Sequence, residues 1–220
     1  RMRREFIANA AHELRTPLTN LQGYLEALRD GVIAPDRATF ESLWDEAERL
    51  VRLSRSLDTL AAGDAGTTAA VREIDLAATI RIAVELARGA ALTAGLELMT
   101  DVPDALPARG DPDQLAQVLG NLLQNAIRYT PPDGRVVIRA ERRPGDLLVS
   151  VTNTGEGIPA QDLPHVFERF YRVEKSRDRG RGGAGIGLAI VRQLVEAAGG
   201  SVGVESANGQ TRFWFSLPAS

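Results

Sequence analysis

The sequence predicts an α-helical hairpin followed by an α+β two-layer sandwich, and three observations support this fold class. Apolar residues in the first 61 positions recur at spacings of three and four, which is typical of helices with one buried stripe. Beyond residue 71, helical patterns alternate with short strand patterns. A small, polar stretch separates the two regions. We therefore expect a hairpin domain at 1–61, a hinge at 62–70 and a second domain at 71–220.

The hairpin prediction is clearest in its second helix, whose stripe consists of Phe40, Leu43, Trp44, Ala47, Leu50, Val51 and Leu57. Residues 30–36, Asp-Gly-Val-Ile-Ala-Pro-Asp, contain the Gly that stops one helix and the Pro that starts the next. A lone hairpin buries only part of such stripes, so we expect a homodimer with a four-helix bundle. The first helix begins without a capping residue, which suggests a fragment of a longer protein.

The second domain is predicted as one mixed sheet with helices on one face. A short strand at 71–75 precedes a helix at 76–94, with Asp75 as its N-cap. The next helix, 112–128, starts with Asp111 as N-cap, Pro112 at the first position and Gln114 in a capping-box-like place. A third helix is expected at 187–198, and further strands at 134–142, 146–153, 201–206 and 211–217.

Composition narrows the possible classes of protein. The chain has 220 residues, a formal net charge of −3 and no cysteine. The charge argues against a nucleic-acid-binding protein, and the lack of cysteine excludes disulfides and thiolate metal sites. No apolar run approaches the roughly 18 residues of a membrane span, and no secretory signal begins the chain. These features fit a cytoplasmic fragment, with any membrane anchor of the full-length protein lying upstream.

His12 is one of two histidines and the candidate nucleophile. Thr16 lies one turn further on the same helix face, and Glu13 is adjacent. A neutral imidazole is a good nucleophile when a carboxylate accepts its other N–H and fixes the tautomer. Pro17 frees a main-chain carbonyl and should bend or loosen the helix. A lone helical histidine is more often a surface or core residue, so these residues alone leave both interpretations open.

The helix at 112–128 and two glycine clusters indicate a nucleotide site. Asn121, Asn125 and Arg128 share one face of this helix, opposite the apolar residues Leu115, Leu119, Leu122 and Ala126. Amide carbonyls suit Mg²⁺, and arginine suits phosphate. Glycines at 155–157 follow a strand, and those at 180–187 open a helix, where free N–H groups favour anions. A solvated helix face and flexible loops would give the same sequence patterns, so this alternative stays open. Neither glycine cluster is a Walker motif.

Considered together, these segments resemble the sensor histidine kinases. Phe6–Leu18 is similar to their phosphoacceptor box, and Asn121–Thr130 to their N box. The first glycine box, F box and second glycine box resemble residues 153–158, 167–172 and 183–188, and a last glycine box resembles residues 208–213. The resemblance covers nearly the whole chain and implies a Bergerat ATPase fold for the second domain.

The resemblance also implies residue roles. His12 would be phosphorylated, Glu13 would act as base, and Thr16 would orient water for dephosphorylating a partner. Asn125 would hold Mg²⁺ with help from Asn121, and Arg172 would neutralise charge on the γ-phosphoryl group. Residues 173–183 would form a lid over ATP. The implied nucleotide site comprises Asn121, Asn125, Arg128, Tyr129, Asn153, Gly155, Gly157, Ile158, Tyr171, Gly183, Gly185, Gly187, Leu188 and Thr211.

The sequence departs from the family pattern at two of these boxes. Asn153 stands where most members have Asp, which accepts a hydrogen bond from the adenine amino group; Asn can still accept through its carbonyl oxygen. Gln210 replaces a glycine that is common in the last box. At most, we expect weakened affinity or altered geometry from Asn153, and not a loss of ATP binding.

The function expected from the resemblance is autophosphorylation on His12 from Mg-ATP, followed by transfer to an aspartate of a response-regulator receiver domain. A phosphatase activity toward that partner is also implied by Thr16. Two other classes stay open. A Bergerat-fold ATPase would hydrolyse ATP independently of His12, and a non-catalytic docking module would have lost its nucleotide residues.

Overall fold

The computed structural model describes residues 2–64, 70–173 and 184–219. The chain divides into two compact units, Arg1–Ala62 and Gly63–Ser220. The predicted fold class is confirmed, since a helical N-terminal region is followed by an α/β sandwich with a mixed sheet. Among the described residues, none of the helices is both long enough and apolar enough to span a membrane.

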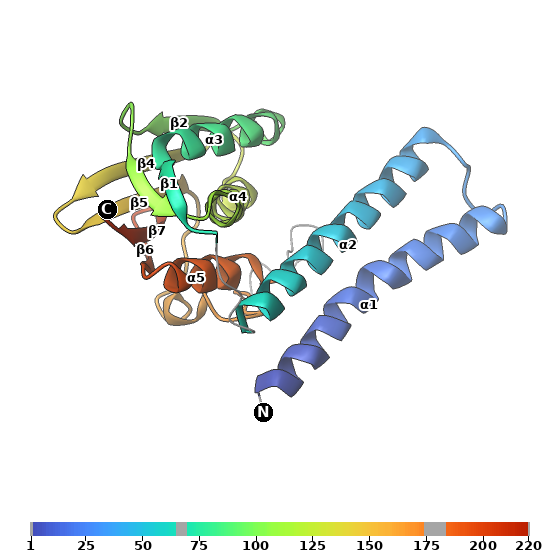
Figure 1. Ribbon diagram of the computed structural model, residues 1–220. Helices are drawn as coiled ribbons and strands as arrows, with labels where there is room; N and C mark the ends of the chain where they lie inside the picture. Colours follow the sequence, from blue (N-terminus) through green and yellow to red (C-terminus); the bar gives the residue numbers. More distant parts are fainter. Residues whose placement is uncertain (1, 65–69, 174–183, 220) are drawn as a thin grey trace. The chain divides into compact units, whose positions relative to one another are not determined.

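The first unit is an antiparallel hairpin of α1 (Met2–Arg29) and α2 (Arg37–Asp64) (Figure 1). Gly31 has a φ of +71° in the connection, a conformation that glycine adopts without strain. The side chain of Asp36 accepts a hydrogen bond of 2.8 Å from the N–H of Thr39 and so caps the start of α2. α1 continues through Pro17 without interruption. Since α2 extends to Asp64, residues 62–64 of the predicted hinge are helical, and 65–69 lie outside the described residues.

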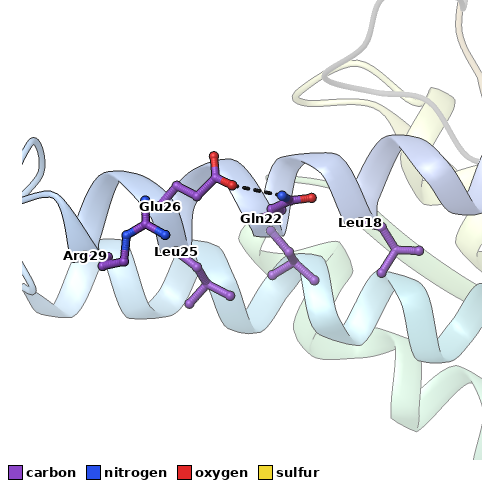
Figure 2. A pocket seen from close by; sticks show the side chains of 6 residues that line it. Leu18, Gln22, Leu25, Glu26 and Arg29 are labelled. Atoms are coloured by element: carbon purple, nitrogen blue, oxygen red, sulfur yellow. Dashed lines mark hydrogen bonds between the residues drawn. The ribbon is translucent and has the colours of Figure 1, made fainter.

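The apolar stripe of α2 is only partly covered within the hairpin. Leu43, Leu50 and Leu57 are half-buried, whereas Phe40 and Trp44 are 55% and 69% exposed. On α1, Leu18 and Leu25 are likewise exposed. Leu18 and Leu25 line a groove of about 650 Å³ on α1, together with Leu21, Gln22, Glu26 and Arg29 (Figure 2). The hairpin thus leaves an apolar surface uncovered on each of its helices.

Among the described residues, the second unit has three helices, two sheets and a short 3-10 turn at Leu163–His165. The helices are α3 (Leu76–Thr93), α4 (Pro112–Tyr129) and α5 (Gly187–Ala197). The main sheet has the order β2-β4-β5-β7-β6. Its strands are β2 (Glu97–Asp101), β4 (Arg135–Arg143), β5 (Asp146–Thr154), β6 (Ser201–Ala207) and β7 (Gln210–Pro218). Of the strand pairs that the structure describes in this sheet, β2–β4 is parallel and the other three are antiparallel.

The core lies between this sheet and the three helices, which pack on one face of it (Figure 1). Alternate residues of β7 are buried and point into the core, namely Thr211, Phe213, Phe215 and Leu217. Trp214 faces the other side, where its ring lies over Gly203 of β6; a Cβ on that glycine would be 2.2 Å from the ring. A side chain at position 203 is therefore incompatible with this packing of Trp214.

The structure corrects the expectation of a single sheet. β1 (Arg72–Asp75) pairs only with β3 (Pro107–Gly110), in a separate two-stranded sheet. Neither β3 nor the edge strand β2 was predicted from the sequence. The sequence of β3 is Pro-Ala-Arg-Gly, and β2 is largely exposed with acidic ends, so both lack the β-branched alternation by which strands are recognised.

Asp75 caps α3, as predicted, and also joins two segments of the fold. Its Oδ1 atom accepts hydrogen bonds from the N–H groups of Ala77, at 3.0 Å, and Leu106, at 2.8 Å. Arg81 forms an ion pair with the same carboxylate at 3.6 Å. The Leu106 N–H, helped by the Ala77 N–H and by Arg81, lowers the pKa of Asp75 below its ordinary value of 3.8. The charged form of Asp75 is therefore favoured in the folded state.

We expect Asp75→Asn to lower the thermal unfolding midpoint at neutral pH by about 2–4 °C. Because the folded-state pKa is depressed, the stabilisation by Asp75 is present above pH 3.8 and is lost as pH falls through the folded-state value. The difference between wild type and variant should therefore shrink below that pH, as measured by thermal denaturation followed by circular dichroism. The control is Glu85→Gln, which removes an exposed pair with Arg88 on α3 and should change little. A constant difference at all pH values would contradict the assigned role of the charge.

Candidate functional site

The predicted phosphoacceptor residues lie on α1 in the first unit. His12 and Thr16 are exposed one turn apart, and Glu13 between them is half-buried. Pro17 is buried inside the helix. An exposed imidazole is accessible to a second reactant, and a neighbouring carboxylate can take its proton. The chemistry that this segment can perform is nucleophilic attack by a ring nitrogen of His12.

The polar face of α4 carries two of the predicted nucleotide residues in partly enclosed positions. Asn121 and Asn125 are half-buried, whereas Arg128 and Tyr129 at the end of the helix are exposed. The apolar residues predicted to pack on the sheet are buried, and Val118 and Leu123 are buried with them. The helix is therefore fixed by its apolar side and presents its amides on the other.

The side-chain amide of Asn121 lacks a hydrogen-bond acceptor in the described part of this site. Its Nδ2 atom is buried and has no hydrogen-bond partner among the described residues. Such a donor costs about 1–3 kcal/mol when it is left unpaired. Gly187, the first residue of α5, lies against the same side chain, since a Cβ at 187 would be 3.7 Å from Asn121 Oδ1. The start of α5 and the amide of α4 are thus neighbours, and an acceptor bound between them would satisfy the amide.

The start of α5 is held in place by the F-box segment. Gly185 has a φ of +68°, and its carbonyl oxygen accepts a hydrogen bond of 2.8 Å from the N–H of Phe170. Ile186, at the N-cap of α5, makes no side-chain capping hydrogen bond. The first N–H groups of a helix lack intrahelical partners and favour an anion. Leu188 in this first turn is half-buried, while Gly183 and most of the predicted lid, 174–183, lie outside the described residues.

The glycine segment after β5 lies against the end of α4. A Cβ on Gly155 would be 2.9 Å from the main-chain oxygen of Tyr129, so the two segments touch through their backbones. The N–H of Gly155 donates to the carbonyl oxygen of Gly209 at 2.9 Å. Gly157 has a φ of +81°. Glycines are therefore required here for close approach and for the turn.

Two buried polar residues are neighbours on adjacent strands at the base of this segment. Asn153 of β5 is 4% exposed, and its register partner on β7, Thr211, is 5% exposed. The Nδ2 atom of Asn153 donates to the carbonyl oxygen of Thr154 at 3.2 Å, which leaves its Oδ1 atom as the acceptor. The arrangement offers an acceptor and a hydroxyl next to the glycine turn.

Tyr171 has a structural contact that the sequence did not predict. Its hydroxyl donates to Asp162 Oδ1 at 2.5 Å, and its ring centroid lies 5.4 Å from that of His165. His165 Nδ1 lies 2.7 Å from Glu168 Oε1, and Phe167 packs edge-on against Phe213 of β7. These contacts anchor the F-box segment to the fold. Arg172, the predicted phosphate-neutralising residue, is half-buried at the end of this segment.

Sequence reasoning missed Ser206 of β6. Its hydroxyl accepts a hydrogen bond of 2.8 Å from the N–H of Ile158 and lies 2.9 Å from Thr211 Oγ1. A signal for it exists in the sequence, because Val202, Val204 and Ser206 occupy alternate positions of one strand. A serine where the alternation calls for an apolar residue indicates a polar contact on the inner face.

The structure thus brings together, within the second unit, predicted residues from α4, β5, β7 and the start of α5. In the part of the chain that is described, no group of three or more His, Asp or Glu side chains is placed to hold a metal ion. A metal ion here would depend on amide oxygens and on oxygens of a ligand.

Comparison with known proteins matches two family models to this chain. Residues 2–66 match the His Kinase A (phospho-acceptor) domain, and residues 110–220 match the histidine kinase-, DNA gyrase B- and HSP90-like ATPase family. The signal transduction histidine-protein kinase BaeS of Escherichia coli K12 is 39% identical over 202 residues. That alignment covers 91% of this chain but only 43% of BaeS.

Two solved structures are similar over almost the whole chain. The histidine kinase AdeS of Acinetobacter baumannii has a TM-score of 0.81 at 27% identity, covering 95% of this chain and 98% of AdeS. Full-length ShkA in complex with AMPPNP has a TM-score of 0.69 at 27% identity, covering 99% of this chain and 46% of ShkA. Both the order of the two units and their folds are therefore shared with these proteins.

Proposed function

This chain belongs to the sensor histidine kinases, and from that membership we propose that it phosphorylates itself on His12 from Mg-ATP. The phosphoryl group then passes to an aspartate of a response-regulator receiver domain. The observation that carries the proposal is the exposed His12 on α1, next to the half-buried Glu13 and inside the segment matched by the phospho-acceptor family. The same chain contains the ATPase-family unit that would supply the phosphoryl group.

In the proposed reaction, the unprotonated ring nitrogen of His12 attacks the γ-phosphorus of ATP. The new N–P bond forms as the bond to the β–γ bridging oxygen breaks, and ADP leaves. The imidazole proton passes to the carboxylate of Glu13, which is adjacent in sequence. Arg172 stabilises the charge that develops on the transferred group.

The nucleotide is proposed to lie between the polar face of α4, the glycine segment after β5 and the start of α5. Asn153 Oδ1 accepts a hydrogen bond from the adenine amino group, and Thr211 assists. Tyr129 flanks the base, and Tyr171, Ile158 and Leu188 line the site. Arg128 contacts the phosphates, and the glycines at 155, 157, 183, 185 and 187 permit close approach.

The residues fit a magnesium ion held jointly by protein and nucleotide. Amide oxygens of Asn125 and Asn121 suit Mg²⁺, which takes few protein ligands, and the unpaired Nδ2 of Asn121 suits a phosphate oxygen beside the ion. The ion would neutralise charge on the phosphates. Asn125 is the proposed protein ligand.

A homodimer is proposed because each hairpin leaves apolar side chains uncovered. Phe40, Trp44, Leu18 and Leu25 are exposed in one chain, and Leu18 and Leu25 line a groove along α1 (Figure 2). A four-helix bundle of two hairpins would cover them. Residues 62–70 are proposed to connect the hairpin domain, 1–61, to the ATP-binding domain, 71–220, and the lid 173–183 to close over the nucleotide.

Thr16 is proposed to orient water for removing the phosphoryl group from the response regulator. The chain is proposed to act in the cytoplasm, and the full-length protein to be anchored in the membrane through another region, since this chain spans under half of BaeS.

The proposal is tested by incubating the chain with γ-labelled ATP and Mg²⁺. Label that is stable in alkali and labile in acid would identify a phosphohistidine, and transfer to a purified receiver domain would identify the second step. ATP turnover without protein-bound label would favour an ATPase. The absence of both reactions and of nucleotide binding would favour a docking module.

A further inference from the structure

Ser206 connects two parts of the proposed nucleotide site that are far apart in the sequence. Its Oγ atom accepts a hydrogen bond of 2.8 Å from the N–H of Ile158, 48 residues away. The same atom lies 2.9 Å from Thr211 Oγ1, and a Cβ on Gly157 would come within 2.9 Å of it. One hydroxyl group thus holds the end of the glycine turn and the threonine of β7 together.

The hydrogen-bonding capacity of Ser206 allows two arrangements at Thr211. A serine hydroxyl has one donor and two acceptor positions. When Ser206 donates to the carbonyl oxygen of Gln210, at 3.4 Å, it can accept from both Ile158 and Thr211. When it donates to Thr211 instead, the proton of Thr211 is free for a ligand. Ser206 therefore lets the Thr211 hydroxyl accept from or donate to a bound nucleobase.

Ser206 and Thr211 lie at one end of the proposed nucleotide site. Thr211 is 5% exposed and lies opposite Asn153 in the β5–β7 register. Ile158 follows the turn at Gly157, whose φ is +81°. Losing the Ser206 hydroxyl would leave the Ile158 N–H without this acceptor and the Thr211 hydroxyl without its neighbour. Both changes affect the wall of the site beside Asn153.

We propose that Ser206 is a positioning residue for nucleotide binding, which orders the glycine turn and orients the Thr211 hydroxyl toward the base. This inference rests on the proposed function, since it assigns the nucleotide site to these residues. Ser206 acts through Ile158 and Thr211 and takes no part in phosphoryl transfer. Its loss should weaken nucleotide binding and leave the chemical step intact.

The test compares wild type, Ser206→Ala, Ser206→Thr and the control Ser216→Ala in the full chain. Ser216 lies on β7 at the other end of the same hairpin, opposite Ser201. We measure the KM for ATP and kcat of autophosphorylation, and the Kd of Mg-ADP by calorimetry. Ser206→Ala should raise KM and Kd about 5- to 30-fold with kcat within about threefold of wild type. Ser206→Thr should restore most of the affinity, and Ser216→Ala should match wild type.

Two outcomes would overturn the proposal. One is an unchanged Kd for Mg-ADP in Ser206→Ala, and the other is an equal loss in Ser206→Ala and Ser216→Ala, which would indicate general weakening of the hairpin. The calorimetric measurement separates this inference from the proposed function. If wild type binds Mg-ADP but gains no acid-labile label, the kinase proposal fails while Ser206 is still decided by its Kd. If wild type binds no Mg-ADP, both fail.

Discussion

Replacing His12 by alanine is expected to lower the acid-labile phosphorylation of the chain by more than about three orders of magnitude. The reason is that the variant retains no nitrogen at this position to form the N–P bond. The measurement is transfer of label from γ-labelled ATP at saturating Mg-ATP. Because His12 is exposed on α1, its removal should leave the helix intact.

The second histidine is an internal control in this experiment. The chain contains only His12 and His165, so acid-labile label that survives in His12→Ala would lie on another residue, with His165 as the remaining histidine. That result would contradict the assignment of the phosphoacceptor. Circular dichroism and the Kd of Mg-ADP should be unchanged in the variant, which distinguishes loss of the acceptor from loss of the fold.

Gly185→Ala is expected to reduce ATP-dependent labelling by on the order of 10- to 100-fold. Gly185 has a φ of +68°, which costs any other residue about 1–3 kcal/mol when the strain is not relieved. An added Cβ would lie 2.7 Å from the main-chain oxygen of Tyr171 and 2.8 Å from the carbonyl carbon of Phe170. These are backbone atoms, so the F-box segment or the start of α5 has to move. Labelling and the Kd of Mg-ADP measure the effect.

Gly89→Ala is the matched control, and it is expected to raise the stability of the fold. Gly89 lies within α3, and a Cβ there would meet no atom within 4 Å. Alanine stabilises such a position by about 0.5–1 kcal/mol and should leave nucleotide binding unchanged. If Gly185→Ala bound Mg-ADP as well as Gly89→Ala does, the link between the F-box segment and the nucleotide site would be wrong.

The elements predicted most accurately are those with strong local signals. Asp75 and Asp111 mark the starts of α3 and α4 because short acceptor side chains satisfy the first N–H groups of a helix. Gln114 fits this pattern through its main-chain N–H, which donates to Asp111 Oδ1 at 3.3 Å. The non-local bonds of the same aspartates were not predictable, as with the N–H of Ala70, which donates to Asp111 at 2.9 Å.

The features that could not be predicted from the sequence, β3 and the role of Ser206, depend on contacts between distant segments. β3 becomes a strand because it pairs with β1, although Pro107 and Gly110 disfavour strands locally. Ser206 acquires its role only when the hairpin of β6 and β7 places it beside Ile158. The assignments at His12, Asn125 and the glycines came from recognising boxes of residues in order, since each box alone also fits a solvated helix or a loop.

The distribution of tryptophan gives each unit its own optical signal. The chain has two tryptophans: Trp44 on α2, and Trp214, half-buried over Gly203 in the sheet. Each tryptophan therefore reports on one unit, and substituting the other removes the second contribution to intrinsic fluorescence. Trp44→Phe leaves emission from the sheet alone, and Trp214→Phe leaves emission from the hairpin alone. Unfolding of one unit can therefore be followed by tryptophan fluorescence, because the other unit then contains no tryptophan.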